Sequence, residues 1–135
     1  MKHYFPKNVK TLIAIDGSTN NWTWLKKVKE YINVDNCKIT FIAVPKTAQE
    51  VNQARKILNL TLNFMEDENF LFMHEDSVIK VGDPAKNIIT YASEKNFDLI
   101  IVGSHNKNSV ERFFMGSVSS TVVAQSPIPV LVMKL

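Results

Sequence analysis

Two Gly-Ser pairs bracket a polar stretch of the chain, GSHNKNSVERFFMGS, from Gly103 to Ser117. Gly103 follows the apolar run DLIIV, and Gly116-Ser117 precedes the segment VSSTVVAQ. A glycine at a strand end leaves nothing between the backbone and a ligand, and a Gly-Ser helix start exposes N–H groups that favour anions. Phosphate binding explains this pattern, and a flexible helix N-cap explains Gly116-Ser117 equally well.

The elements that must position these turns alternate along the chain between short apolar runs and segments of helical periodicity. We expect strands over 10–16, 37–44, 77–81 with 70–73 leading into it, 98–102 and 129–133. We expect helices over 24–33, 47–65, 84–95 and 118–125. No internal repeat, low-complexity tract or linker divides the sequence, so a single domain over residues 1–135 is predicted.

Local signals mark several of these boundaries. Asp83-Pro84 offers an N-cap followed by a proline in the first helical turn, and Asn96 is able to adopt the left-handed conformation that ends a helix. The segment 118–125 is rich in Ser, Thr and Val and favours a strand by propensity. It is nevertheless predicted to be a helix, because parallel strands at 98–102 and 129–133 need a crossover between them.

The alternation predicts an α/β fold, an open parallel sheet with helices on both faces. Ligands of such sheets bind beyond the carboxyl ends of the strands, where the strand order reverses. Four loops meet at that edge: the exits after Asp16, Val44 and Val81, and the stretch from Gly103 to Ser117. The chemistry of the Gly-Ser pairs therefore falls where this fold places its ligands.

The spacing of Gly103, Asn106 and Gly116-Ser117 resembles the G-x2-G-x9-G-[ST] nucleotide loop of the universal stress protein family. The likeness extends over essentially the whole chain, through IAIDGS, IAV, VGDPAKNI, DLIIVGS and the final PVLV. It implies a Rossmann-like five-stranded sheet of order 3-2-1-4-5 that binds ATP, or ADP or AMP, with Mg²⁺ as a possible companion.

The resemblance also implies site residues. Those for adenine and ribose are Ala14, Ile15, Asp16, Gly17, Ser18 and Val44. Those for the phosphates are Gly103, Asn106, Gly116, Ser117 and Val118, with His105 and Ser119 as further candidates. Asp16 suits a ribose hydroxyl because a carboxylate accepts hydrogen bonds strongly, and it also suits an N-cap of the first helix.

The sequence departs from the family pattern at Asn106, which stands where the loop has its middle glycine. Asn tolerates the left-handed region, so the turn itself is compatible with this residue. Its side chain either crowds a triphosphate or donates an amide hydrogen to it. Both alternatives stay open.

Composition narrows the class of protein. The chain has 135 residues, a formal net charge of +3 and one cysteine, Cys37, which we expect to be a small buried side chain. No apolar run is long enough to span a membrane, no signal peptide is evident, and the lysines of the first helix form no nucleic-acid footprint. We expect a cytoplasmic protein with no membrane or nucleic-acid partner. His3, His74 and His105 lack ligand spacing, so no metal site is predicted.

The function that these observations favour is a stress-response protein that binds an adenine nucleotide and acts as a regulatory homodimer. The resemblance implies pairing of two subunits through the last strand, around Val130 and Val132. No P-loop or nucleophile elbow is present, so no catalytic residue is assigned. The alternatives are a nucleotide-free dimerisation or scaffold protein of the same fold and a slow ATPase or autophosphorylating enzyme.

Overall fold

A computed structural model describes residues 9–15, 23–31, 37–67, 75–104 and 117–134 of the chain. The strands are β1 (Val9–Ala14), β2 (Cys37–Ala43), β3 (Glu75–Ile79), β4 (Leu99–Ser104) and β5 (Val130–Lys134). The helices are α1 (Thr23–Tyr31), a short 3-10 turn η2 (Ala48–Glu50), α2 (Val51–Asp67), α3 (Pro84–Glu94) and α4 (Ser117–Gln125).

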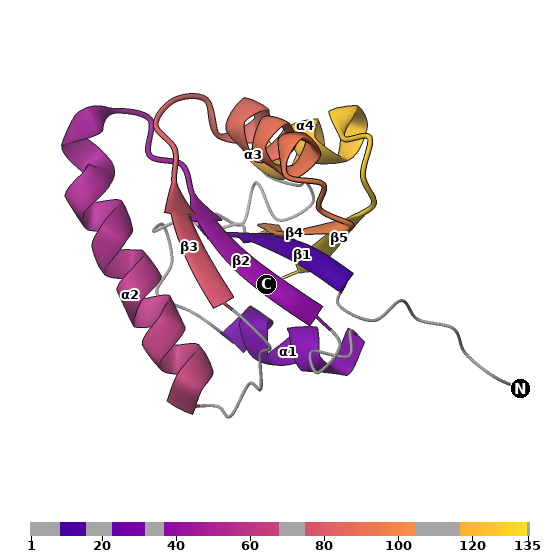
Figure 1. The fold of residues 1–135 in the computed structure, drawn as a ribbon, viewed down its shortest axis with the longest axis horizontal. Helices are drawn as coiled ribbons and strands as arrows, with labels where there is room; N and C mark the ends of the chain where they lie inside the picture. Colours follow the sequence, from indigo (N-terminus) through magenta and orange to yellow (C-terminus); the bar gives the residue numbers. More distant parts are fainter. Residues whose placement is uncertain (1–8, 16–22, 32–36, 68–74, 105–116, 135) are drawn as a thin grey trace, which may run out of the picture.

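The five strands form one parallel sheet of order β3-β2-β1-β4-β5. Helices α1 and α2 cover one face of the sheet, and α3 and α4 cover the other (Figure 1). The predicted α/β class, strand order and single domain are confirmed. The order reverses between β1 and β4, which makes their carboxyl ends the expected place for a ligand.

Two apolar clusters hold the layers together, one on each face, because successive side chains of a strand point to opposite faces. In β1, Ile13 belongs to the cluster beneath α1 and α2, whereas Leu12 belongs to the cluster beneath α3 and α4. Phe41 and Ile42 divide in the same way in β2. Strands buried on both faces explain why these segments read as continuous apolar runs.

Helix α3 begins as its sequence predicts. The Asp83 carboxylate accepts a hydrogen bond of 2.9 Å from the Lys86 N–H, and Pro84 occupies the first turn. Helix α4 is also confirmed, over Ser117–Gln125, although its Ser, Thr and Val residues favour a strand. Tertiary packing overrides propensity here, since Val122 is completely buried against the sheet.

Helix α3 ends at Glu94, and Asn96, two residues beyond, has the predicted left-handed backbone with φ of 59°. The Phe97 N–H donates to the Ala92 carbonyl at 2.9 Å, and the Asn96 N–H donates to the Ser93 carbonyl at 3.3 Å. These two bonds form a Schellman motif, which satisfies carbonyls that the helix end would otherwise leave unpaired. Phe97 and Ala92 also share the apolar cluster beneath α3 and α4.

The boundaries of all five strands differ from their predictions. β1 runs over Val9–Ala14 rather than 10–16, and β2 ends at Ala43 rather than at residue 44. β3 runs over Glu75–Ile79 rather than 77–81, because its register against β2 ends with Ala43↔Ile79. β4 extends to Ser104, so Gly103 lies inside the strand and pairs with Met133. β5 begins at Val130 because Pro129 has no N–H, while the Pro129 carbonyl still accepts from Ile100 at 3.0 Å. The predicted lead-in at 70–73 lies outside the described residues.

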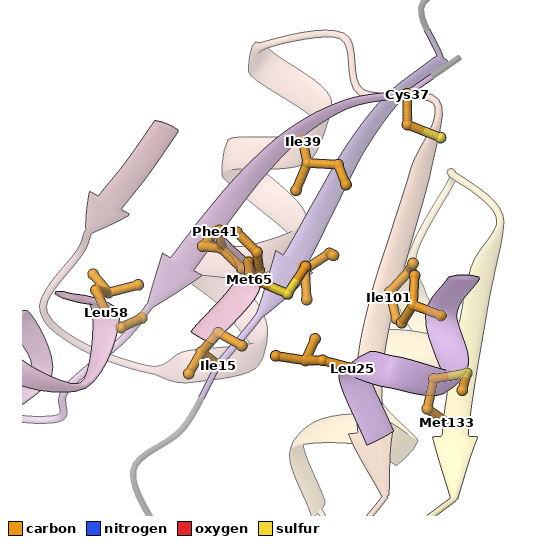
Figure 2. Close-up of a cluster of buried hydrophobic side chains, with 12 residues drawn as sticks. Ile15, Leu25, Cys37, Ile39, Phe41, Leu58, Met65, Ile101 and Met133 are labelled. Atoms are coloured by element: carbon orange, nitrogen blue, oxygen red, sulfur yellow. The ribbon is translucent and has the colours of Figure 1, made fainter. Parts of the chain in front are cut away.

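Cys37 is buried, as predicted, with 4% of its surface exposed. Burial raises the pKa of its thiol above the ordinary value. Because the thiolate is the reactive form of cysteine, a raised pKa makes this side chain a poor nucleophile. Its role is packing in the cluster beneath α1 and α2 (Figure 2).

The left-handed backbone at Asn96 generates a stability prediction. Asn96→Ala should lower the free energy of unfolding by about 1 kcal/mol, because Asn tolerates the left-handed conformation through local hydrogen bonds of its side chain, which Ala cannot make. Asn96→Gly is the matched control and should be neutral or slightly stabilising. Urea unfolding followed by circular dichroism measures both variants. Equal stability of the two variants would show that Asn96 does not carry the helix stop.

Candidate functional site

Strand β1 separates from β4 at the carboxyl edge of the sheet, whereas it stays paired with β2 along its whole length. Its pairing with β4 ends at Ile13↔Ile101, and its pairing with β2 ends at Ala14↔Ile42. By contrast, the β4–β5 pairing continues to Ser104↔Lys134. The edge therefore opens between β1 and β4, while β4 stays paired with β5 and the Ile15 N–H still bonds to the Ile42 carbonyl of β2.

The exits of β2 and β3 remain joined beyond the regular strands. The Lys80 N–H donates to the Ala43 carbonyl at 3.1 Å, and the Gly82 N–H donates to the Pro45 carbonyl at 2.9 Å. Gly82 has φ of 136°, and a β-carbon there would lie 3.1 Å from the Asn87 side-chain nitrogen. Only glycine suits this turn, which fixes the chain beside Val44.

Val44 presents main-chain groups to the opening next to β1. Ala43 and Pro45 direct their carbonyls to the β3 side, whereas the Ile42 carbonyl accepts from Ile15 on the β1 side at 2.8 Å. Since alternate residues of a strand direct their hydrogen-bonding groups to opposite neighbours, the N–H and C=O of Val44 lie on the β1 side. Among the described residues, neither group has a hydrogen-bond partner.

The start of α4 is fixed at the end of β4 by one side chain. The Ser119 hydroxyl donates a hydrogen bond of 2.8 Å to the Gly103 carbonyl, and Ser119 is only 3% exposed. Because Ile100 donates to β5, the alternation along β4 turns Gly103 toward β1. The bond therefore holds the first turn of α4 at the opening between β1 and β4.

The side chains of the predicted site residues lie on two different faces of the sheet. Ala14, Val44 and Val118 are partly buried against the apolar cluster beneath α3 and α4. The Ile15 side chain instead lies in the opposite cluster, with Leu25 and Met65 (Figure 2). Only the main chain of Ile15 can therefore face a ligand at the carboxyl edge of the sheet. Its N–H already donates to the Ile42 carbonyl, which leaves the Ile15 carbonyl.

Three of the predicted residues begin α4. Ser117 is exposed, Val118 is half-buried and Ser119 is buried. The first N–H groups of a helix have no intrahelical partners, so these residues offer anion-binding donors at the opening. The remaining predicted residues, Asp16, Gly17, Ser18, His105, Asn106 and Gly116, lie outside the described residues.

Sequence reasoning missed two features of this edge. The Ser119–Gly103 bond joins residues that are 16 positions apart, and no local pattern indicates it. The link from Gly82 to Pro45 could have been suspected, because a glycine directly before Asp83-Pro84 is typical of a backbone with positive φ.

Within the ranges that the structure describes, no group of three or more His, Cys, Asp or Glu side chains is arranged to hold a metal ion. The helices described in those ranges also include none that is both long and apolar enough to cross a membrane. The described part of the edge offers main-chain donors at Val44 and in the first turn of α4.

An open parallel sheet whose strand order reverses between β1 and β4, with helices on both faces, defines the doubly wound class of α/β fold. The model of the universal stress protein family matches residues 8–134. The chain therefore belongs to the universal stress protein family.

Curated relatives agree with this assignment. The chain is 42% identical over 59 residues to the stress response protein NhaX of Bacillus subtilis, covering 44% of this chain and 36% of that protein. It is 40% identical over 57 residues to the universal stress protein MJ0577 of Methanocaldococcus jannaschii, covering 42% of this chain and 35% of that protein. The matched segments span roughly a third of each relative's length.

Solved structures share the fold over nearly the whole chain. The structure of MJ0577 superposes with a TM-score of 0.69 at 29% identity, covering 94% of this chain and 96% of that one. A universal stress protein of Arabidopsis thaliana with AMP bound has a TM-score of 0.68 at 19% identity and coverages of 93% and 91%. A universal stress protein of Archaeoglobus fulgidus in complex with dAMP has a TM-score of 0.68 at 18% identity and coverages of 97% and 98%.

Proposed function

We propose that this protein binds an adenine nucleotide at the carboxyl edge of its sheet and acts as a regulatory module in a stress response. The observation that carries the proposal is the Ser119–Gly103 hydrogen bond of 2.8 Å. It holds helix N–H groups at the opening between β1 and β4, where this class of sheet binds its ligands. The predicted domain over residues 1–135 is part of the same proposal.

In this proposal Val44 recognises the base. Its N–H and C=O lie side by side toward β1, which gives one donor and one acceptor. Adenine presents the complementary pair on its Watson–Crick edge, an acceptor at N1 beside a donor at N6. Guanine presents a donor at N1 and an acceptor at O6, so the same backbone pair would face groups of its own kind.

The phosphates would lie at the start of α4. The N–H groups of Ser117, Val118 and Ser119 supply neutral donors and the positive end of the helix dipole. The Ser119 hydroxyl already donates to Gly103, so this side chain serves the site by holding the helix. Gly116, Asn106 and His105 complete the proposed phosphate loop, Asp16, Gly17 and Ser18 the ribose side, and Mg²⁺ would accompany a triphosphate.

Relatives support the class of ligand. The proteins of Arabidopsis thaliana and Archaeoglobus fulgidus carry AMP and dAMP on the same fold. ATP is our proposed ligand because of the glycine loop in the sequence, and AMP and ADP share the base and ribose that the edge would recognise.

The proposed unit is a homodimer in the cytoplasm. β5 is the outermost strand next to β4 and carries the partly buried Val130 and Val132. An edge strand with an apolar face favours pairing with a second copy. The cytoplasm suits a chain whose one cysteine is a buried thiol.

Two other functions compete with this proposal. A scaffold of the same fold would form the dimer without binding nucleotide. A slow ATPase or autophosphorylating enzyme would bind ATP and turn it over. The first is distinguished by nucleotide binding and the second by phosphate release.

Titration calorimetry with ATP, ADP and AMP, with and without Mg²⁺, tests the nucleotide proposal. Binding should be saturable, and a ligand at about 100 times its Kd should add about 2.7 kcal/mol to the free energy of unfolding, visible as a higher Tm. GMP should bind at least about tenfold more weakly than AMP, which corresponds to about 1.4 kcal/mol.

No heat and no change in Tm at millimolar adenine nucleotide would contradict binding and favour the scaffold. Equal affinity for GMP and AMP would contradict base recognition by Val44. Steady phosphate release under saturating ATP with Mg²⁺ would favour the enzyme.

Sedimentation equilibrium tests the homodimer. The wild-type chain should show twice its monomer mass at micromolar concentration, and Val132→Lys should shift the protein toward monomer by placing a charge on the β5 face. Lys38→Ala, on the exposed surface of β2, is the control and should leave the mass unchanged. A concentration-independent monomer mass for the wild type would contradict the dimer.

A further inference from the structure

Side-chain hydrogen bonds hold helix α4 in place at both of its ends. Its first turn is held to β4 by the bond from Ser119 to Gly103. At its other end, the Ser126 hydroxyl donates to the Ile128 carbonyl at 2.8 Å and lies 2.9 Å from the Ile128 N–H, which donates to it. Pro127 and Pro129 fix two further backbone angles in this connection. Residues 126–129 therefore form a stiff turn between α4 and β5.

The side of α4 that faces the sheet packs over the outer strand. Val118 and Val122 belong to the same apolar cluster as Val130 and Val132 of β5. β5 has only one neighbour in the sheet, β4, and it is packed between α4 on one face and α1 on the other, where Leu131 and Met133 share a cluster with Leu25. Restraining α4 should therefore also restrain β5, because the two elements share an apolar cluster and are joined by the turn at residues 126–129.

We propose that α4 couples occupancy of the nucleotide site to the local order of β5, with Ser119 as a positioning residue. This inference rests on the proposed function. A nucleotide with its base at Val44 and its phosphate at Ser117 would bridge the β2 end to the helix and restrain α4. Local opening of β5 requires α4 to move as well. A bound nucleotide that restrains α4 should therefore lower the frequency of this opening.

The Ser119–Gly103 bond restrains α4 in the absence of ligand. Removing it should let α4 move together with β5 and should leave the phosphate donors less well placed. Both effects follow from one change, because the bond and the ligand hold the same element. By reciprocity, anything that orders β5, including pairing with a second copy, should increase nucleotide affinity by the same factor.

Hydrogen exchange measured by mass spectrometry tests the coupling on the full chain, with AMP and ATP as probes. Saturating nucleotide should slow exchange in 130–134 about fivefold or more, in the usual range of coupling between sites. β3, the opposite edge strand, is the internal control for global stabilisation. Its exchange should slow less, because β2, β1 and β4 separate it from β5, and α4 packs over β4 and β5.

Ser119→Ala should speed exchange of 130–134 in the free protein and weaken AMP binding, and saturating AMP should restore the protection. Thr121→Ala is the matched control, because it removes a hydroxyl bond of the same 2.8 Å length, to the Ser117 carbonyl inside α4, without releasing the helix from β4. It should behave as wild type.

The wild-type measurements decide the proposal even if Ser119→Ala does not fold. Calorimetric binding with unchanged exchange in β5, or with equal slowing of β3 and β5, would overturn the coupling and leave the proposed function intact. Ser119→Ala with wild-type affinity and exchange would overturn the role of Ser119. Absence of calorimetric binding would overturn the proposed function, and the coupling with it.

Discussion

The separation of β1 from β4 at the carboxyl end of the sheet is the feature on which the proposed site depends. At the amino end the strands are held closely: the Lys10 N–H donates to the Asp98 carboxylate at 2.9 Å, and the Asp98 N–H donates to the Lys10 carbonyl at 2.8 Å. At the carboxyl end the β1–β4 pairing stops at Ile13↔Ile101 while β4 continues to Ser104. At the amino end of the strands, β1 and β4 are therefore joined by hydrogen bonds, and at the carboxyl end they are not.

The open edge gains its chemistry from the main chain. The described elements around it contribute the N–H and C=O of Val44 and the N–H groups at the start of α4. Main-chain donors of this kind need accurate placement because they cannot change rotamer, and two long-range contacts supply it. Gly82 ties β3 to Pro45 beside Val44, and Ser119 ties α4 to Gly103. These two contacts fix the backbone on either side of the edge.

Much of this fold is predictable from the sequence, for reasons that differ between elements. Asp83-Pro84 and Asn96 act through local backbone chemistry and were placed correctly. Helix α4 was predicted from the need for a crossover, against its own propensity. The β3 boundary was wrong by two residues because pairing with β2, rather than local composition, sets its register.

The site was less accessible to sequence reasoning. Family likeness indicates which residues gather at the edge but not which group of each residue faces it. Ile15 shows the difference, since its side chain packs in the core beneath α1 and α2. Ile13 and Ile15 share one face by alternation, so this orientation was predictable in principle. The Ser119–Gly103 contact was not, because it depends on how α4 docks on β4.

A titration with AMP followed by the backbone amide resonances of the protein tests most directly whether the open edge is the nucleotide site. The amides of Val44, Gly103, Ser117, Val118 and Ser119 should shift with one common Kd, and those of Lys10 and Asp98 at the amino end of the strands should not. Shifts confined to the amino end of the strands, or no saturable shift at Val44 and the start of α4, would contradict the proposed site.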